Sequence, residues 1–208
     1  VTANGQTAGR GRHGRTFFSP KDAGLYMTVA LTPHMPAEWL LNMTAYAAVC
    51  VAEAIERLTG ASPRIKWVND LFVDGRKVCG ILTEAVTDFE SGTVESLLVG
   101  IGINLRQSDV PDSLREVVGF LNVTSPVRNR LVAAITNALL RYTPQDHAFW
   151  DAYRERSLTI GRRVQCTQGN RSFTGMATAI DESGALVVLA DSGDTVALRS
   201  GEAILLPQ

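Results

Sequence analysis

The spacing of apolar residues changes near residues 157–161, and this change restricts the fold more than any other feature of the chain. Before it, segments with helical spacing alternate with runs typical of β-strands. After it, short β-strand runs recur about every ten residues between turns rich in Gly, Asn, Asp and Ser, a pattern typical of a small barrel or sandwich. We therefore expect an α+β fold with two domains: a mixed or antiparallel sheet flanked by helices in residues 1–158, and a small β-barrel in residues 159–208.

Helix start and stop signals predict three main helices. In the clearest of them, apolar residues follow helical spacing from Pro36 to Leu58, and Gly60 suits the exit. A Ser-Pro pair and a Thr-Pro pair, each typical of an N-cap followed by the first helical residue, open the other two. We therefore expect helices at residues 36–58, 125–141 and 143–156, and a short helix at 111–118.

Strands are predicted where β-branched and aromatic runs are bounded by turn residues. Asp74-Gly75, which lies between two apolar runs, is a strong signal for a two-residue hairpin. The remaining strands are expected at Thr16–Phe18, Leu25–Leu31, Ser96–Asn104, Val164–Thr167, Ser172–Ile180, Ala185–Leu189 and Thr195–Arg199.

The segment Gly9–Arg15 interleaves three arginines with three glycines. Charged residues are almost never fully buried without a partner, so this segment cannot lie in a core. Glycine lets backbone N–H groups approach a ligand and form turns that bind anions, and the planar arginine side chain matches carboxylate and phosphate geometry. The segment therefore predicts an anion clamp formed by Arg10, Arg12 and Arg15; a basic surface loop without a ligand is the alternative.

Composition limits the ligands of this clamp. The formal net charge of −1 excludes a globally basic surface for nucleic acid and favours a small anionic ligand. The 3 cysteines are widely spaced, with no Cys-x-x-Cys pair, so a reducing cytoplasm is expected and a disulfide framework is not. No metal-ligand spacing is found among the 3 histidines, and no run approaches the roughly 18 apolar residues of a membrane span.

Three further motifs follow the Gly/Arg segment: Lys66–Asp70, Lys77–Glu84 and Gly100–Leu105. In this order and at these spacings, the four motifs resemble the catalytic domain of the biotin protein ligase family over residues 1 to about 105. The C-terminal β region is similar to that family in outline. The resemblance implies the biotin/lipoate ligase fold, which is like that of class II synthetases, with a small C-terminal β-barrel domain.

The resemblance implies an ATP-dependent, AMP-forming reaction in two steps. Biotin and ATP, with Mg²⁺ on the nucleotide phosphates, would give biotinyl-5′-AMP and pyrophosphate. The acyl group would then pass to a lysine on the carrier domain of a biotin-dependent carboxylase. A homodimer formed through a sheet edge is one arrangement that the family implies. No helix-turn-helix pattern is found in this sequence, so the DNA-binding role of some relatives is not expected of it.

The resemblance also assigns roles to residues. A carboxylate must attack a phosphate and both are anions, so cations and positioning are expected to dominate catalysis, through Lys77, Arg10 and Arg12. Biotin binding is implied for Gln6, Arg10, Gly11, Arg12, Lys77 and Gly80. ATP or adenylate binding is implied for Arg12, Arg15, Phe17, Asn69, Asp70 and Asn104. In contrast, Lys66 is interpreted as a strand-edge charge and Trp67 as a core residue.

Two other functions are consistent with parts of the pattern. A lipoate protein ligase shares the fold and the adenylation chemistry, although its anion loop is richer in glycine and alternates Gly and Arg less. A non-catalytic module that binds a nucleotide, an effector or nucleic acid is the second alternative. The chain opens on Val1, and the Ser-Thr-Asn element that precedes the clamp in the family has no counterpart, so an N-terminal portion of the natural protein is expected upstream.

Overall fold

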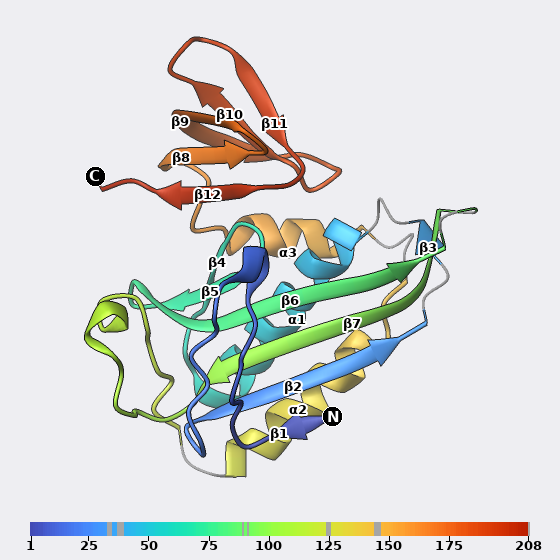
Figure 1. Cartoon of the computed structure of the whole chain (residues 1–208), viewed down its shortest axis with the longest axis vertical. Helices are drawn as coiled ribbons and strands as arrows, with labels where there is room; N and C mark the ends of the chain where they lie inside the picture. Colours follow the sequence, from blue (N-terminus) through green and yellow to red (C-terminus); the bar gives the residue numbers. More distant parts are fainter. Residues whose placement is uncertain are drawn as a thin grey trace.

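The computed structural model describes residues 1–32, 35–36, 40–88, 90, 92–123, 126–143 and 147–207 (Figure 1). These residues form two antiparallel sheets and three α-helices, which confirms the predicted α+β fold with a small C-terminal β domain. Short 3₁₀ turns lie at Arg12–Gly14 and Asp112–Leu114. The helices are α1 (Leu40–Thr59), α2 (Pro126–Leu139) and α3 (Phe149–Glu155).

The first sheet contains seven of the described strands, in the order β1-β2-β7-β6-β5-β4, with β3 paired to β7. The predicted hairpin joins β5 to β6, and Asp74 and Gly75 both have positive φ angles, 49° and 76°, as this two-residue turn requires. The strands are β1 (Thr2–Ala3), β2 (Gly24–Leu31), β3 (Met35–Pro36), β4 (Arg64–Lys66), β5 (Asp70–Val73), β6 (Arg76–Thr87) and β7 (Thr93–Asn104).

Alternation of side chains along β6 and β7 gives this sheet two different faces. Ile81, Ile101 and Ile103 are buried on the core side, where α1 and α2 lie behind the sheet in Figure 1. Gly80 and Gly102, which pair across β6 and β7, belong to the opposite face, which the N-terminal segment crosses. One face therefore forms the core, and the other is left for a site.

Five short strands of the described chain form the second sheet, in the order β11-β10-β9-β8-β12. Trp67 joins it to the first sheet: its backbone N–H donates to Thr159 Oγ1 (2.9 Å) and its indole N–H to the Gly184 carbonyl (3.1 Å). Trp67 is 4% exposed, in agreement with its interpretation as a core residue. The strands are β8 (Arg163–Gln168), β9 (Arg171–Ile180), β10 (Leu186–Ala190), β11 (Thr195–Leu198) and β12 (Glu202–Leu205). The division into domains after residue 158 stays a prediction.

Two predictions for the N-terminal half are wrong. Helix α1 begins at Leu40 and not at Pro36, because the backbone at Pro36 pairs with β7 in the short strand β3. Proline is tolerated in such short peripheral strands. Residues 16–18 do not form a strand: Thr16 makes only an isolated bridge with Arg10, since this segment closes the Gly/Arg loop on itself.

The helix expected at residues 111–118 is reduced to one 3₁₀ turn. Residues 117–119 leave the helical path because their backbone hydrogen-bonds with that of Lys77. The predicted start of α2 at Ser125, and residues 144–146 ahead of α3, lie outside the described residues. In the part of the chain that the structure describes, no helix is both long and apolar enough to cross a membrane.

Candidate functional site

A cleft of about 340 Å³ lies on the second face of the first sheet. The N-terminal loop, β6, β7, the turn between β4 and β5, and the start of β12 contribute to its lining. Its basic side chains outnumber its acidic ones, so the cleft has the charge that an anionic ligand requires. The basic residues are Arg10, Arg12, Arg15, Lys66 and Lys77, and the acidic ones are Asp70, Glu84 and Glu202.

Two facing glycines form the floor of the cleft. Gly80 on β6 pairs with Gly102 on β7, and the Phe17 ring lies against both. A side chain on Gly102 would overlap this ring, and a Cβ atom on Gly80 would lie 3.0 Å from it. Lys77 Nζ lies 5.8 Å from the ring centroid, within the range of a cation–π contact. The glycines therefore let an aromatic residue of the loop reach the sheet.

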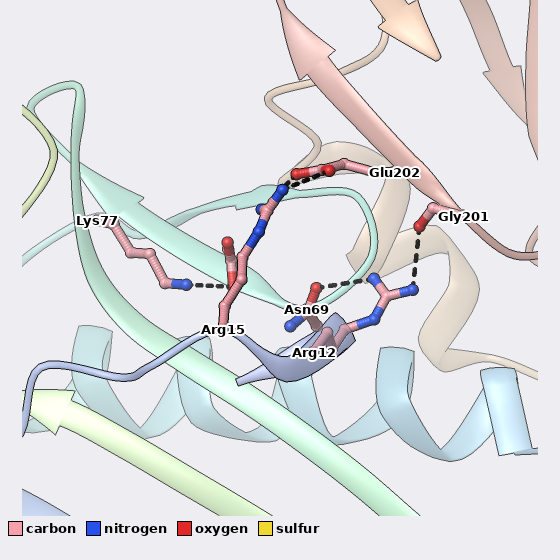
Figure 2. Close-up of polar contacts among 7 residues, drawn as sticks. Arg12, Arg15, Asn69, Lys77, Gly201 and Glu202 are labelled. Carbon is pink, nitrogen blue, oxygen red and sulfur yellow. Dashed lines mark hydrogen bonds and ion pairs between the residues drawn. The ribbon is translucent and has the colours of Figure 1, made fainter. Parts of the chain in front are cut away.

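Arg12 connects the loop to both sheets (Figure 2). Its guanidinium donates from Nη1 to Asn69 Oδ1 (3.2 Å) and from Nη2 to the Gly201 carbonyl (3.0 Å). Asn69 in turn donates from Nδ2 to the Ile81 carbonyl (2.7 Å), which fixes the orientation of its side chain. Burial lowers the pKa of Arg12, but an arginine stays charged at neutral pH. A half-buried positive charge is thus held at the mouth of the cleft.

Lys77 is held at both its backbone and its ammonium group. Its Nζ lies 2.7 Å from Asp70 Oδ1, an ion pair between β6 and β5 that is dashed in Figure 2. Its backbone N–H donates to the Val117 carbonyl (2.7 Å), and its carbonyl accepts from the Gly119 N–H (2.8 Å). The side chains of Lys77 and Asp70 are 26% and 21% exposed, so an anion that enters the cleft can compete with Asp70 for the ammonium.

Arg15 and Glu202 join the loop to β12 (Figure 2). Arg15 Nη1 and Nη2 donate to the two carboxylate oxygens of Glu202, at 2.5 and 2.6 Å. This bidentate contact holds the pKa of Glu202 below its ordinary value of 4.5 and raises the pKa of Arg15. Because the Arg15 side chain is 63% exposed, water and salt screen the pair.

Replacing Glu202 with Gln is expected to lower the free energy of unfolding by about 1 kcal/mol or less at pH 7, the range of exposed ion pairs. Because folding lowers the pKa of Glu202, its carboxylate stabilises the native protein above the pKa of the unfolded chain. This contribution is lost as the pH falls through the folded-state pKa. Urea unfolding of both proteins at pH 7 and at about pH 3 checks the sign, since the two stabilities should converge in acid. A difference that persists in acid would assign the effect to packing.

All but one of the predicted site residues line this cleft: Gln6, Arg10, Gly11, Arg12, Arg15, Phe17, Asn69, Asp70, Lys77 and Gly80. The exception is Asn104, which is 4% exposed and is not part of the lining. Its Nδ2 donates to the Gly119 carbonyl (3.0 Å) and more weakly to the Lys77 carbonyl (3.4 Å). Asn104 therefore braces the segment that holds Lys77. The ligand roles of all these residues stay predictions.

The cleft lining also includes residues that were not among the predicted ones, and two of these are the charged residues Lys66 and Glu202. Lys66 does lie on an edge strand, as its interpretation states, but it also lines the cleft, directly across from Asp70 on β5. The sequence carries a signal for this, because the apolar Ile65 is expected to face the core and the next side chain of a strand points to the opposite face. In the structure Ile65 is fully buried. Glu202 is 187 positions from its partner Arg15, and no local pattern brings the two together.

Two family models match the chain: the biotin/lipoate A/B protein ligase family over residues 1–104, and the biotin protein ligase C terminal domain over residues 159–206. The chain is 34% identical over 206 residues to the bifunctional ligase/repressor BirA of Bacillus spizizenii, a match that covers 93% of this chain and 62% of that protein. It is 30% identical over 217 residues to a biotin–(acetyl-CoA-carboxylase) ligase of Mycobacterium tuberculosis, covering 99% of this chain and 78% of that protein.

A solved structure shares the fold over the whole chain. The biotin protein ligase from Aquifex aeolicus in complex with biotin and ATP has a TM-score of 0.82 and 28% identity, and the match covers 100% of this chain and 88% of that one. The chain spans 62% of the length of the Bacillus BirA relatives that it matches. The first family model includes the cleft-lining residues of all four motifs, and the second includes the lining residue Glu202. The chain belongs to the biotin protein ligases of the biotin/lipoate A/B protein ligase family.

Proposed function

We propose that the chain is an ATP-dependent biotin protein ligase, which activates biotin as biotinyl-5′-AMP and transfers it to a lysine of a carboxylase carrier domain. The observation that carries the proposal is the convergence of Arg10, Arg12 and Lys77 on one cleft. The first step joins a carboxylate to a phosphate, so fixed positive charges lower the repulsion between the two anions. The names of the relatives support biotin and ATP as the substrates.

Biotin is proposed to bind along the loop and the glycine floor, and the nucleotide beside the turn between β4 and β5. The biotin side has Gln6, Arg10, Gly11, Arg12, Gly80 and Lys77, and the nucleotide side has Arg12, Arg15, Phe17, Asn69 and Asp70. Asn104 fits a role in ATP binding less well than these residues, because its Nδ2 already donates to two backbone carbonyls. An adenine contact by this residue would use its Oδ1 atom.

Lys77 is proposed to bridge the two reacting anions. A carboxylate oxygen of biotin forms a bond with the α-phosphorus, and the bond from that phosphorus to the bridging oxygen breaks as pyrophosphate leaves. Lys77 exchanges Asp70 for the substrate, while Arg10 and Arg12 offset the negative charge. In the second step, the neutral amine of the acceptor lysine attacks the acyl carbon, AMP leaves with the bonding electrons, and the amine loses a proton.

Mg²⁺ is proposed to enter with ATP, since this ion is commonly held by substrate phosphates together with one or two carboxylates. Within the described ranges, no group of three or more His, Cys, Asp or Glu side chains could enclose a metal ion. Of the lining carboxylates near the proposed nucleotide side, Glu202 has both oxygens bound by Arg15, so Asp70 fits as the protein ligand. The ion would neutralise part of the phosphate charge.

The acceptor is proposed to be the carrier domain of a biotin-dependent carboxylase, in line with the name of the Mycobacterium relative. A homodimer would form through a sheet edge, and β1 and β4 are the edges of the first sheet among the described strands. We place the reaction in the cytoplasm, because buried free thiols suit a reducing compartment. These thiols are Cys50, Cys79 and Cys166.

The exchange of labelled pyrophosphate into ATP tests the first step. We expect exchange that depends on biotin and MgATP, and biotinylation of a purified carrier domain when one is added. Equal exchange with lipoate would favour a lipoate ligase. No exchange with either acid would favour a non-catalytic module, and binding of nucleic acid that weakens steeply with salt would identify its ligand.

A further inference from the structure

Lys66 lies deeper in the cleft than its position on an edge strand suggests. It is the last residue of β4, pairs in register with Asp70 of β5, and is half-buried. The residue before it, Ile65, is 0% exposed, so the strand is anchored in the core by one side chain while the next one lines the cleft.

The ammonium of Lys66 has no partner among the described residues, in contrast to the other half-buried cations of the cleft. Arg12 is bonded to Asn69 and Gly201, and Lys77 is paired with Asp70. Lys66 makes no hydrogen bond or ion pair with any described side chain. Burial lowers its pKa, against the opposing effect of nearby Asp70 and Glu202. A desolvated charge without a partner costs stability, so this lysine is not explained by folding.

Hydrogen bonds hold the backbone next to Lys66, so the segment cannot easily move to take the ammonium out of the cleft. The backbone N–H of Trp67 donates to Thr159 Oγ1 (2.9 Å), and its indole N–H donates to the Gly184 carbonyl (3.1 Å). Tyr153 donates from its hydroxyl to the Val68 carbonyl (3.1 Å). The turn that follows Lys66 is therefore fixed between α3 and the second sheet. As a result, Lys66 keeps its place in the lining of the cleft.

The neighbours of Lys66 indicate which part of a substrate it faces. Lys77 lies over the Phe17 ring at the glycine floor, where the proposed biotin and nucleotide sides meet. Lys66 pairs in register with Asp70, a residue of the proposed nucleotide side, and both residues line the cleft. Directly opposed residues of two antiparallel strands lie on the same face, so the Lys66 side chain belongs to this side as well. Because Lys77 is assigned to the reacting carboxylate and the α-phosphate, Lys66 is the lysine of the cleft left for the phosphates beyond them.

We propose that Lys66 binds the β- and γ-phosphates of ATP and stabilises pyrophosphate as it leaves. The inference rests on the proposed ligase function and adds a residue to its first step. When the carboxylate oxygen bonds to the α-phosphorus, the electrons of the broken P–O bond pass to the pyrophosphate oxygen, and the fixed ammonium offsets that charge. Pyrophosphate takes no part in the transfer of biotin to the acceptor lysine, so Lys66 acts in one half-reaction only.

The test compares Lys66→Met with the wild type and with Lys21→Met, which removes the same charge from an exposed turn outside the cleft. Three measurements are made: binding of inorganic pyrophosphate by titration, the KM for pyrophosphate in the reverse reaction with biotinyl-5′-AMP, and single-turnover transfer from added biotinyl-5′-AMP to the carrier domain. We expect Lys66→Met to weaken pyrophosphate binding and raise that KM by about tenfold, the scale of one charged hydrogen bond. Transfer should change by less than about twofold, and Lys66→Arg should restore part of the binding.

The possible outcomes separate the role of Lys66 from the proposed ligase function. Unchanged pyrophosphate binding and KM in Lys66→Met would overturn the role of Lys66 while the ligase function stands. An equal loss in the reverse reaction with pyrophosphate and in transfer would also overturn it, since a purely structural role affects both steps. A loss confined to transfer would assign Lys66 to the acceptor lysine instead. A wild-type protein that binds pyrophosphate through Lys66 but forms no adenylate would overturn the ligase function and leave the phosphate site.

Discussion

Replacing Lys77 with Ala is expected to lower the rate of biotin-dependent ATP–pyrophosphate exchange by about 100- to 1,000-fold, the usual cost of removing one preorganised donor to a developing charge. Lys77 Nζ lies 2.7 Å from Asp70 Oδ1 and 5.8 Å from the Phe17 ring, at the glycine floor where the two anions would meet. Without the ammonium, their repulsion is no longer offset at the point of attack. Steady-state exchange at saturating ATP, with biotin varied, measures the change.

The same variant leaves Asp70 without its ion partner, so its folding needs a control. The double variant Lys77→Ala with Asp70→Asn removes both charges, and its activity should stay as low as that of the single variant. Lys21→Ala, with one charge lost outside the cleft, should keep wild-type exchange. If Lys77→Ala forms the adenylate at a rate within about threefold of the wild type, the catalytic assignment of Lys77 is wrong.

Replacing Arg12 with Met is expected to raise the dissociation rate of biotinyl-5′-AMP by about 10- to 100-fold, because one or two charged hydrogen bonds are lost. Methionine keeps most of the apolar stem, so the loss is mainly one of charge. Arg12 is the residue that joins the loop to Asn69 of the first sheet and to the Gly201 carbonyl beside β12. Its loss should open the cleft at the side where the adenylate is held.

Release of labelled adenylate from the preloaded protein, chased with unlabelled adenylate, gives this rate directly. Arg171→Met, on an exposed position of β9, is the matched control and should leave release unchanged. Synthesis of the adenylate should also slow, since Arg12 is expected to face the reacting groups. A variant that both retains and forms the adenylate like the wild type would contradict the clamp assigned to the Gly/Arg loop.

The structural features that the sequence predicts correctly are those set by residues close together in the chain. The hairpin at Asp74-Gly75 follows from a turn that needs two positive φ angles, and the structure has both. Gly11 and the three arginines of the loop line one cleft with Lys77 and Asp70, and the anion clamp that they are expected to form stays a prediction. The start of α1 was misplaced, because the pairing of Pro36 with β7 depends on residues more than fifty positions away.

Local pattern alone determined the α+β class, the small C-terminal β domain and the residues of the anion loop, because side-chain periodicity and turn chemistry act over a few residues. Tertiary structure decided which charges meet. It paired Arg15 with Glu202 across 187 positions, turned Asn104 toward the backbone near Lys77, and left Lys66 in the cleft without a partner among the residues that the structure describes. These results depend on how two sheets pack and on which charges lose water, and both are properties of the folded chain.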